Sequence, residues 1–238
     1  MNNMEGVWCE RAFAPWGDME EEMRSHHLPL WTLESHDPLE EFDVIAFSLG
    51  YEMAYSNVLN MLELGNIPLR SCDRGDSLKH LVIAGGTSVY NPEPMADFLD
   101  ICIEGEGEDV DVELLECYRS AKRRGLSRHE FLLEAAKIPG IYVPSLYEHT
   151  YNDDGTIREI IPLEGAPKIV TKRIVQDMDA AYYPTETIVP STQIVHDRTV
   201  LELFRGCIRG CRFCQAGFCY RPVRPKSPER LYEIAVKS

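Results

Sequence analysis

Two short stretches decide the fold, Asp-Val-Ile-Ala-Phe-Ser-Leu at residues 43–49 and Lys-His-Leu-Val-Ile-Ala at residues 79–84. Both are apolar runs rich in β-branched side chains and bounded by turn residues, which is typical of buried parallel strands. Each run leads into a glycine and then into a segment with helical periodicity. This alternation predicts the α/β fold class, with a Rossmann-like and largely parallel sheet.

Three helices are predicted around these strands. Residues 56–64 have the apolar spacing of a helix that should stop at Gly65, in the C′ position. Residues 107–124 begin with acidic and end with basic side chains, as the helix dipole favours. A capping box at residues 127–130 should begin the third helix. Together with the strands, these helices define a first domain over residues 1–140.

After residue 140 the sequence pattern changes from helical periodicity to extended segments. Extended segments on either side of an Asp-Gly turn at residues 154–155 predict a hairpin, and a proline-containing stretch follows it, so residues 141–195 are assigned as a hairpin and extended linker. A strand over residues 199–204 should then lead into a cysteine-rich loop. Ser227 is placed to cap a last helix. Residues 196–238 are therefore the start of a second domain.

Charge is distributed unevenly along the 238 residues. The net charge is −15, but residues 196–238 contain nine Lys or Arg and four Asp or Glu, so that they carry +5 and the first 195 residues carry −20. The acidic body disfavours nonspecific binding of nucleic acid, although nucleic acid as a partner of the whole chain stays undetermined. The basic end is either ordinary solvated charge or the surroundings of an anionic ligand.

Neither a membrane span nor a secretion signal is predicted. The longest uninterrupted apolar stretches, such as Leu-Val-Ile-Ala at residues 81–84, fall far short of the roughly 18 residues that cross a bilayer. Residues 1–13 contain two glutamates and no apolar signal region. We therefore expect a cytoplasmic protein without a membrane partner.

Half of the eight cysteines lie within thirteen residues, at Cys207, Cys211, Cys214 and Cys219. In a reducing compartment such a cluster indicates metal ligation before disulfides. The first three, spaced by three and then two residues, can wrap three thiolates around one compact inorganic cluster. Thiolates select zinc, copper(I) or iron–sulfur centres, so ligand type alone does not choose the metal. A structural zinc site would need Cys219 as its fourth ligand.

This segment resembles the signature of radical S-adenosylmethionine (SAM) enzymes, three cysteines at this spacing with an aromatic residue, Phe213, directly before the last. The resemblance implies that Cys207, Cys211 and Cys214 bind three irons of a [4Fe–4S] cluster, and it makes Phe213 a cofactor-binding residue. It also implies that the fourth iron chelates SAM, which an electron from the cluster cleaves to a 5′-deoxyadenosyl radical. No catalytic residue beyond the cluster ligands is identified.

The resemblance extends over nearly the whole chain, to an uncharacterised bacterial group in which a cobalamin(B12)-binding-like lobe precedes the radical SAM domain. The stretches that carry it are residues 9–20, 83–86, 91–94, 105–108 and 220–224. By this resemblance, residues 1–140 are a cobalamin-binding-like lobe lacking its first strand. Residues 196–238 then form the first β/α unit of a partial (β/α)₆ barrel.

Gly85 and Gly86 are candidate cofactor-binding residues, because ligands bind at the carboxyl ends of parallel strands. Glycines required for a tight turn between strand and helix are the alternative. Cobalamin is a further candidate cofactor, although the Asp-x-His-x-x-Gly motif that supplies a histidine ligand to cobalt does not occur.

The sequence thus predicts a radical SAM enzyme of unassigned reaction and unknown substrate. The resemblance implies SAM and a small reductant protein, such as flavodoxin or ferredoxin, as partners. Only 24 residues follow Cys214, so we expect a fragment of a longer protein that does not turn over substrate alone and that associates with a second chain supplying the rest of the barrel. The alternative is a non-catalytic interaction module with a four-cysteine zinc or iron–sulfur site.

Overall fold

A four-stranded sheet with strand order β1-β2-β3-β4 organises the first part of the chain. Its strands are β1 (Val44–Ser48), β2 (Leu81–Gly85), β3 (Ile101–Ile103) and β4 (Ile141–Tyr142). The first three are parallel, in a register that pairs Ile45 with Val82 and Ala84 with Cys102, whereas β4 is antiparallel to β3. The predicted α/β class and parallel strands are confirmed, with one antiparallel strand at an edge.

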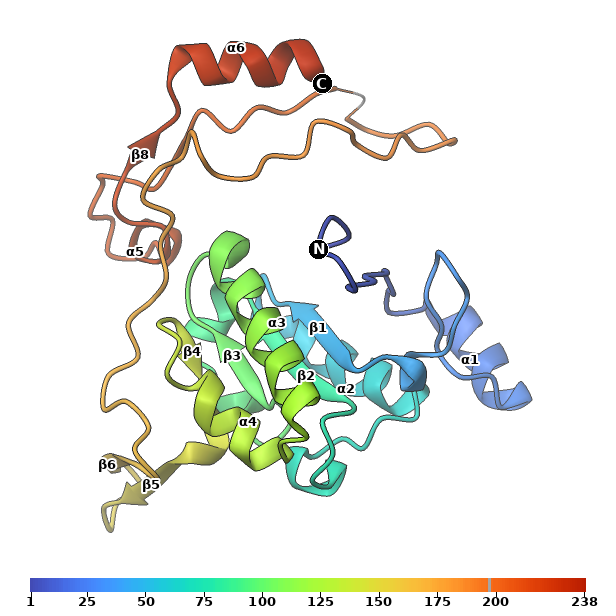
Figure 1. Ribbon diagram of the computed structural model, residues 1–238, viewed down its shortest axis with the longest axis vertical. Helices are drawn as coiled ribbons and strands as arrows, with labels where there is room; N and C mark the ends of the chain where they lie inside the picture. Colours follow the sequence, from blue (N-terminus) through green and yellow to red (C-terminus); the bar gives the residue numbers. More distant parts are fainter. Residues whose placement is uncertain (197) are drawn as a thin grey trace. The chain divides into compact units, whose positions relative to one another are not determined.

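The computed structural model describes residues 1–196 and 198–238. It divides into two compact units, Met1–Arg173 and Ile174–Ser238, which are described separately (Figure 1). Asp197, counted in the charge of the basic end, lies outside the described residues. Within the described part of the chain, no helix has the length and apolar character needed to cross a bilayer.

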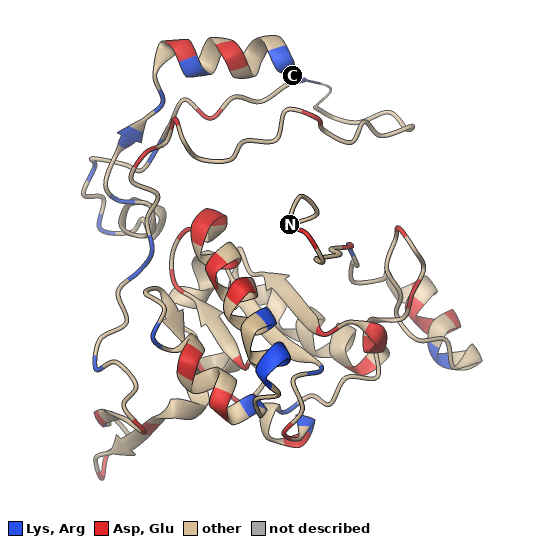
Figure 2. Cartoon of the chain, viewed as in Figure 1, with Lys and Arg blue, Asp and Glu red and all other residues tan. Residues whose placement is uncertain are grey.

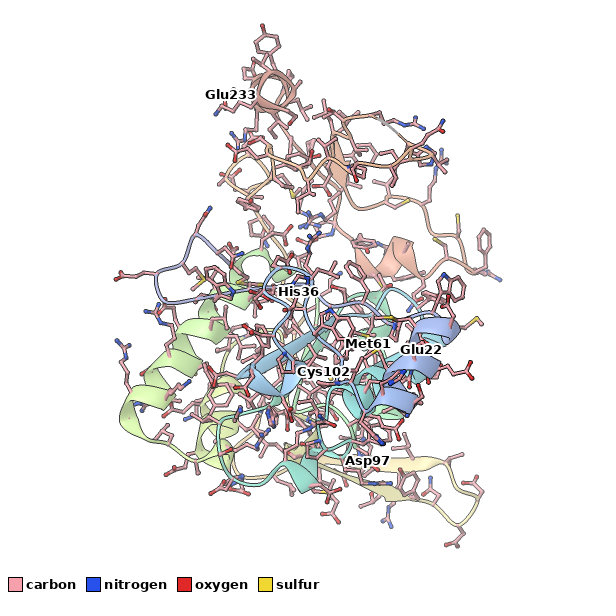
Figure 3. The ribbon with its side chains drawn as sticks, turned by 90° about the vertical axis from the view of Figure 1, so that its right-hand side faces the viewer. Glu22, His36, Met61, Asp97, Cys102 and Glu233 are labelled. Atoms are coloured by element: carbon pink, nitrogen blue, oxygen red, sulfur yellow. The ribbon has the colours of Figure 1, made fainter. Side chains whose placement is uncertain are left out.

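Helices cover both faces of the sheet. The helices of this unit are α1 (Gly17–His26), α2 (Tyr55–Leu64), α3 (Gly107–Arg124) and α4 (Arg128–Ala135). On one face, α2 packs Leu62 against Val82 and the buried Cys102, which Figure 3 labels inside the lobe. On the other face, α3 and α4 pack Leu114 and Phe131 against the strands, and Figure 1 shows α3 crossing in front of the sheet. The core is therefore two apolar layers separated by the sheet.

The predicted helix ends are confirmed with one exception. Gly125 ends α3 with φ 69°, and Ser127 and Glu130 form the predicted capping box of α4. At the end of α2, however, Gly65 has φ −85° and Asn66 adopts the left-handed conformation with φ 56°. The prediction that Gly65 occupies the left-handed C′ position is wrong, because Asn also tolerates this conformation.

A charged network is buried beside the amino ends of β2 and β3. The fully buried Asp100 forms ion pairs with Arg74 at 2.8 Å and with Arg128 at 2.9 Å. Its carboxylate also accepts hydrogen bonds from the Val82 N–H at 2.7 Å and the Ser71 hydroxyl at 2.5 Å. One carboxylate therefore joins the loop before β2, the start of α4 and two strands.

The first unit extends beyond the predicted boundary at residue 140. A hairpin of β5 (Tyr147–Tyr151) and β6 (Ile157–Pro162) confirms the predicted turn. Farther along, Arg173 donates its N–H to the Glu104 carbonyl at 2.7 Å and accepts from the Glu106 N–H at 2.9 Å. These bonds fix residue 173 beside the carboxyl end of β3, so residues 141–173 of the predicted hairpin and linker belong to this unit, whereas residues 174–195 belong to the second.

The second unit contains little regular structure. Its elements are β7 (Phe204–Arg205), α5 (Ala216–Cys219), β8 (Arg224–Pro225) and α6 (Pro228–Lys237). Ser227 caps α6 by accepting from the Arg230 N–H, as predicted. The strand predicted over residues 199–204 is wrong for residues 199–203, because only Phe204 and Arg205 pair with the two residues of β8. The barrel unit stays a prediction.

Candidate functional site

The cysteine loop lies between two strands that pair with each other. β7 precedes it and β8 follows it, and the two run antiparallel. At the base of the loop, Gly206 has φ 100°, and a Cβ built there would lie 2.3 Å from the Pro222 carbonyl oxygen. Only glycine can bring its backbone this close to Pro222. Gly206 thus lets the backbone close the base of the loop, and the loop cysteines lie on the segment between β7 and β8.

Three of the four cysteines lie on the loop, and the fourth lies on the helix after it. Cys207 and Cys214 are half-buried and Cys211 is exposed, whereas Cys219 of α5 is buried. A turn joins Cys211 and Cys214, since the Cys214 N–H donates to the Cys211 carbonyl at 3.1 Å. The Sγ of Cys207 accepts the Arg209 N–H at 3.4 Å. The structure therefore distinguishes the three loop cysteines from Cys219 by their exposure.

The loop thiols are not gathered into a coordination sphere. Among residues 1–196 and 198–238, no group of three or more His, Cys, Asp or Glu side chains has a geometry that would hold a metal ion. The chemistry of the donor set nevertheless fits an iron–sulfur cluster, since three soft thiols lie on one short loop. The assignment of Cys207, Cys211 and Cys214 as cluster ligands stays a prediction.

Large apolar side chains of the loop face solvent. Phe213 is 93% exposed and Ile208 is 83% exposed. Burying such side chains on binding a ligand or another chain segment would be favourable. The cofactor-binding role of Phe213, which directly precedes the third cysteine, stays a prediction.

The basic side chains around the loop have different surroundings. Arg205 and Lys226 both form ion pairs with Glu202, at 2.8 and 2.9 Å. Arg224 is buried and donates to the Val175 carbonyl at 2.6 Å. By contrast, Arg209 and Arg212 are exposed on the loop itself. Much of the positive charge at this end therefore stabilises the unit, and two arginines stay available beside the cysteines.

Gly85 and Gly86 lie at the carboxyl end of β2, in the other unit. A Cβ on Gly86, which has φ 112°, would lie 2.4 Å from the Leu49 carbonyl oxygen. Packing therefore explains Gly86 without a ligand, whereas a Cβ on Gly85 would make ordinary contacts. Both glycines also line a cavity of about 480 Å³. Their cofactor-binding role and cobalamin binding stay predictions.

Two carboxyl groups near this strand end were missed by reasoning from the sequence. Burial raises the pKa of Glu104 to about 7 and that of Asp111 to about 6. Glu104 directly follows β3, and Asp111 lies in the second turn of α3, within the acidic first half that Figure 2 shows in red. The glycines at positions 105 and 107 were the available signal in the sequence for these two residues. Glycine has no side chain, so it lets neighbouring segments approach Glu104 and Asp111.

Stability should fall as the pH rises through the range in which Glu104 titrates differently in the folded and unfolded chains. The unfolded carboxyl loses its proton near pH 4.5 and the folded one near pH 7, so the stabilisation is fully present below pH 4.5 and is lost between these values. Glu104→Gln should remove this decline and be about 2 kcal/mol more stable than the wild type at pH 8, after allowance for partial exposure.

Urea unfolding at pH 5, 6, 7 and 8 measures this difference. Glu159→Gln is the control, because Glu159 is exposed on β6. Equal pH dependence of the wild type and Glu104→Gln would show that Glu104 is not desolvated.

Comparison with known proteins identifies the family to which the chain belongs, through a match that ends before the cysteine loop. The family described as radical SAM proteins, N-terminal, matches residues 1–144. Since the match covers more than half of the chain, the protein belongs to this radical SAM family. An uncharacterized protein of Methanocaldococcus jannaschii is similar, with 28% identity over 214 residues that cover 89% of this chain and 38% of the relative. No solved structure matches the chain.

Proposed function

We propose that the cysteine loop binds a [4Fe–4S] cluster through Cys207, Cys211 and Cys214 and that the protein carries out radical SAM chemistry. The observation that supports this most directly is the exposure of the loop cysteines. Cys207, Cys211 and Cys214 are exposed or half-buried, whereas Cys219 is buried. Membership of the radical SAM family supports the same reaction class.

Each group on the loop has a separate role in this proposal. The three thiolates hold the cluster, which supplies the electron that reductively cleaves SAM. Arg209 and Arg212 are exposed on the same loop, and their positive charge would attract the carboxylate of SAM. Ile208 and Phe213 present apolar surface that keeps water from the site once it is covered.

The remaining parts of the reaction are not assigned to residues of this loop. The chain spans 38% of the length of its archaeal relative. We propose that SAM, a small reductant protein such as flavodoxin or ferredoxin, and further barrel strands complete the site. The residues of the loop do not indicate a class of substrate, because none of their side chains is specific to one such class.

The test is anaerobic reconstitution of the chain with iron and sulfide, followed by iron analysis and electron paramagnetic resonance after reduction with dithionite. Cys207→Ser, Cys211→Ser and Cys214→Ser should each lower bound iron at least about fivefold, since a cluster held by two thiolates is labile. Cys219→Ser is the matched control and should retain iron, and added SAM should change the spectrum of the wild-type cluster.

Two results would contradict the proposal. Stoichiometric zinc without iron uptake would indicate a structural metal site. Loss of metal in Cys219→Ser equal to that in Cys214→Ser would indicate a four-cysteine site, which leaves no open iron for SAM.

A further inference from the structure

A largely apolar cavity lies between the sheet, helix α3 and the N-terminal segment of the first unit. Its volume is about 480 Å³, within the range of pockets that hold small organic ligands. Ala46, Ile83 and Ile103 line it from three neighbouring strands, and Leu115 lines it from α3. Trp8 lines it from the N-terminal segment. An apolar or aromatic ligand body would replace water along these side chains.

The charged side chains that line the cavity are acidic. Among the described residues that line it there is no lysine and no arginine, whereas Glu10 and Asp111 are present. Glu10 is already bound, since it accepts hydrogen bonds from the Thr32 hydroxyl at 2.5 Å and the Ser35 hydroxyl at 2.7 Å. Among the described residues, no hydrogen bond or ion pair is present at the carboxyl group of Asp111. Asp111 is thus the acidic side chain of this cavity that has neither a hydrogen bond nor an ion pair within the described part of the chain.

The surroundings of Asp111 show what would compensate it. Burial is the main cause that raises its pKa, Glu108 raises it further, and the amino group of Met1, which also lines the cavity, lowers it. A positive charge therefore stabilises this carboxylate. A phosphate group would instead meet the carboxylate, although glycines at the carboxyl ends of parallel strands bind phosphate in many Rossmann-like folds.

We propose that this cavity binds a small organic cation, with an aromatic or apolar body against the sheet and a protonated amine beside Asp111. This site lies in the first unit, and the inference does not depend on a cluster at the cysteine loop. An amine, rather than a phosphate-bearing ligand, then binds at the carboxyl ends of β1, β2 and β3.

A pair of probes with one ring system and opposite charge tests the proposal. Isothermal titration calorimetry at pH 7.5 should show that tryptamine binds the apo chain at least about tenfold more tightly than indole-3-acetate. Asp111→Asn should weaken tryptamine about tenfold and bring the two affinities together. Asp109→Asn, which removes one charge at an exposed position of the same helix, should leave the difference unchanged.

Two further measurements separate a specific site from general attraction to an acidic protein. Lowering the pH through about 6 should weaken tryptamine as Asp111 gains a proton, and this pH effect should be absent in Asp111→Asn. Glu10, Glu108 and the amino group of Met1 are the other titrating groups near it. Ala46→Trp, which fills the cavity from an exposed position of β1, should abolish binding of tryptamine.

Several results would overturn the inference. They are no binding of tryptamine at millimolar concentration, equal affinity for the two probes, equal loss in Asp109→Asn and Asp111→Asn, or tryptamine binding that survives in Ala46→Trp. Circular dichroism of each variant confirms that the lobe is folded, so that a loss of binding is not a loss of structure.

Discussion

Asp100→Ala should lower the free energy of unfolding by about 3–5 kcal/mol, because removing one partner of a buried ion pair leaves the other charge without compensation. In this chain the effect concerns two arginines at once, Arg74 and Arg128, which share the Asp100 carboxylate. The substitution also leaves the Val82 N–H without its acceptor. Urea unfolding followed by circular dichroism measures the change.

Asp97→Ala is the matched control for this substitution. Asp97 also forms an ion pair, with Arg70 at 2.6 Å, but its side chain is 66% exposed, and Figure 3 labels it on the same lobe. An exposed pair contributes at most about 1 kcal/mol. If Asp100→Ala does not fold, Asp100→Asn is measured in its place, because it keeps the side-chain volume. Similar losses in Asp97→Ala and in both Asp100 variants would show that the network is not buried in solution.

Gly206→Ala should disrupt the cysteine loop without unfolding the first unit. The added Cβ would lie 2.3 Å from the Pro222 carbonyl oxygen at a backbone φ of 100°, a conformation that costs a residue with a side chain about 1–3 kcal/mol before the clash is counted. We expect bound iron to fall at least about fivefold after reconstitution. Without metal, Cys219 should react faster with a thiol reagent, because the added Cβ would also lie 2.7 Å from the carbonyl oxygen of Tyr220 and would displace the segment that contains the buried Cys219.

Gly210→Ala is the control on the same loop. A Cβ at Gly210 would meet no heavy atom within 4 Å, so this variant should keep both its iron and the slow reaction of Cys219. Unchanged reactivity of Cys219 in Gly206→Ala would contradict the closed base of the loop. Loss of iron with unchanged reactivity of Cys219 would show that Gly206 is needed for metal binding but not for keeping Cys219 buried.

Features set by neighbouring residues could be predicted from the sequence. The bounds of α3, the capping box at Ser127 and the cap of α6 at Ser227 all follow from side chains within a few positions. Local rules failed at Gly65, where two residues that both tolerate unusual backbone angles are adjacent. There, Gly65 lies close to Leu39, to which an added Cβ would come within 3.0 Å, and Asn66 adopts the left-handed conformation.

Features set by distant residues could not be predicted. Asp100 contacts Arg74 and Arg128, 26 and 28 positions away, and Arg173 pairs with Glu104 across 69 positions. No periodicity carries such information. The same reason explains the candidate sites: the spacing of the cysteines was visible in the sequence, whereas the isolation of Asp111 in an apolar cavity depends on which segments fold against it.

The outer edge of β1 has a consequence for how this protein behaves at high concentration. The neighbouring residues Asp43 and Leu49 bond toward β2, so in a parallel ladder Val44, Ala46 and Ser48 direct their peptide groups away from it. Such a row of peptide groups favours pairing with another chain and aggregation. Glu40 and Glu41 directly precede this edge, and their like charges oppose the approach of a second copy. We therefore expect part of the acidic excess of this lobe to oppose aggregation at this edge.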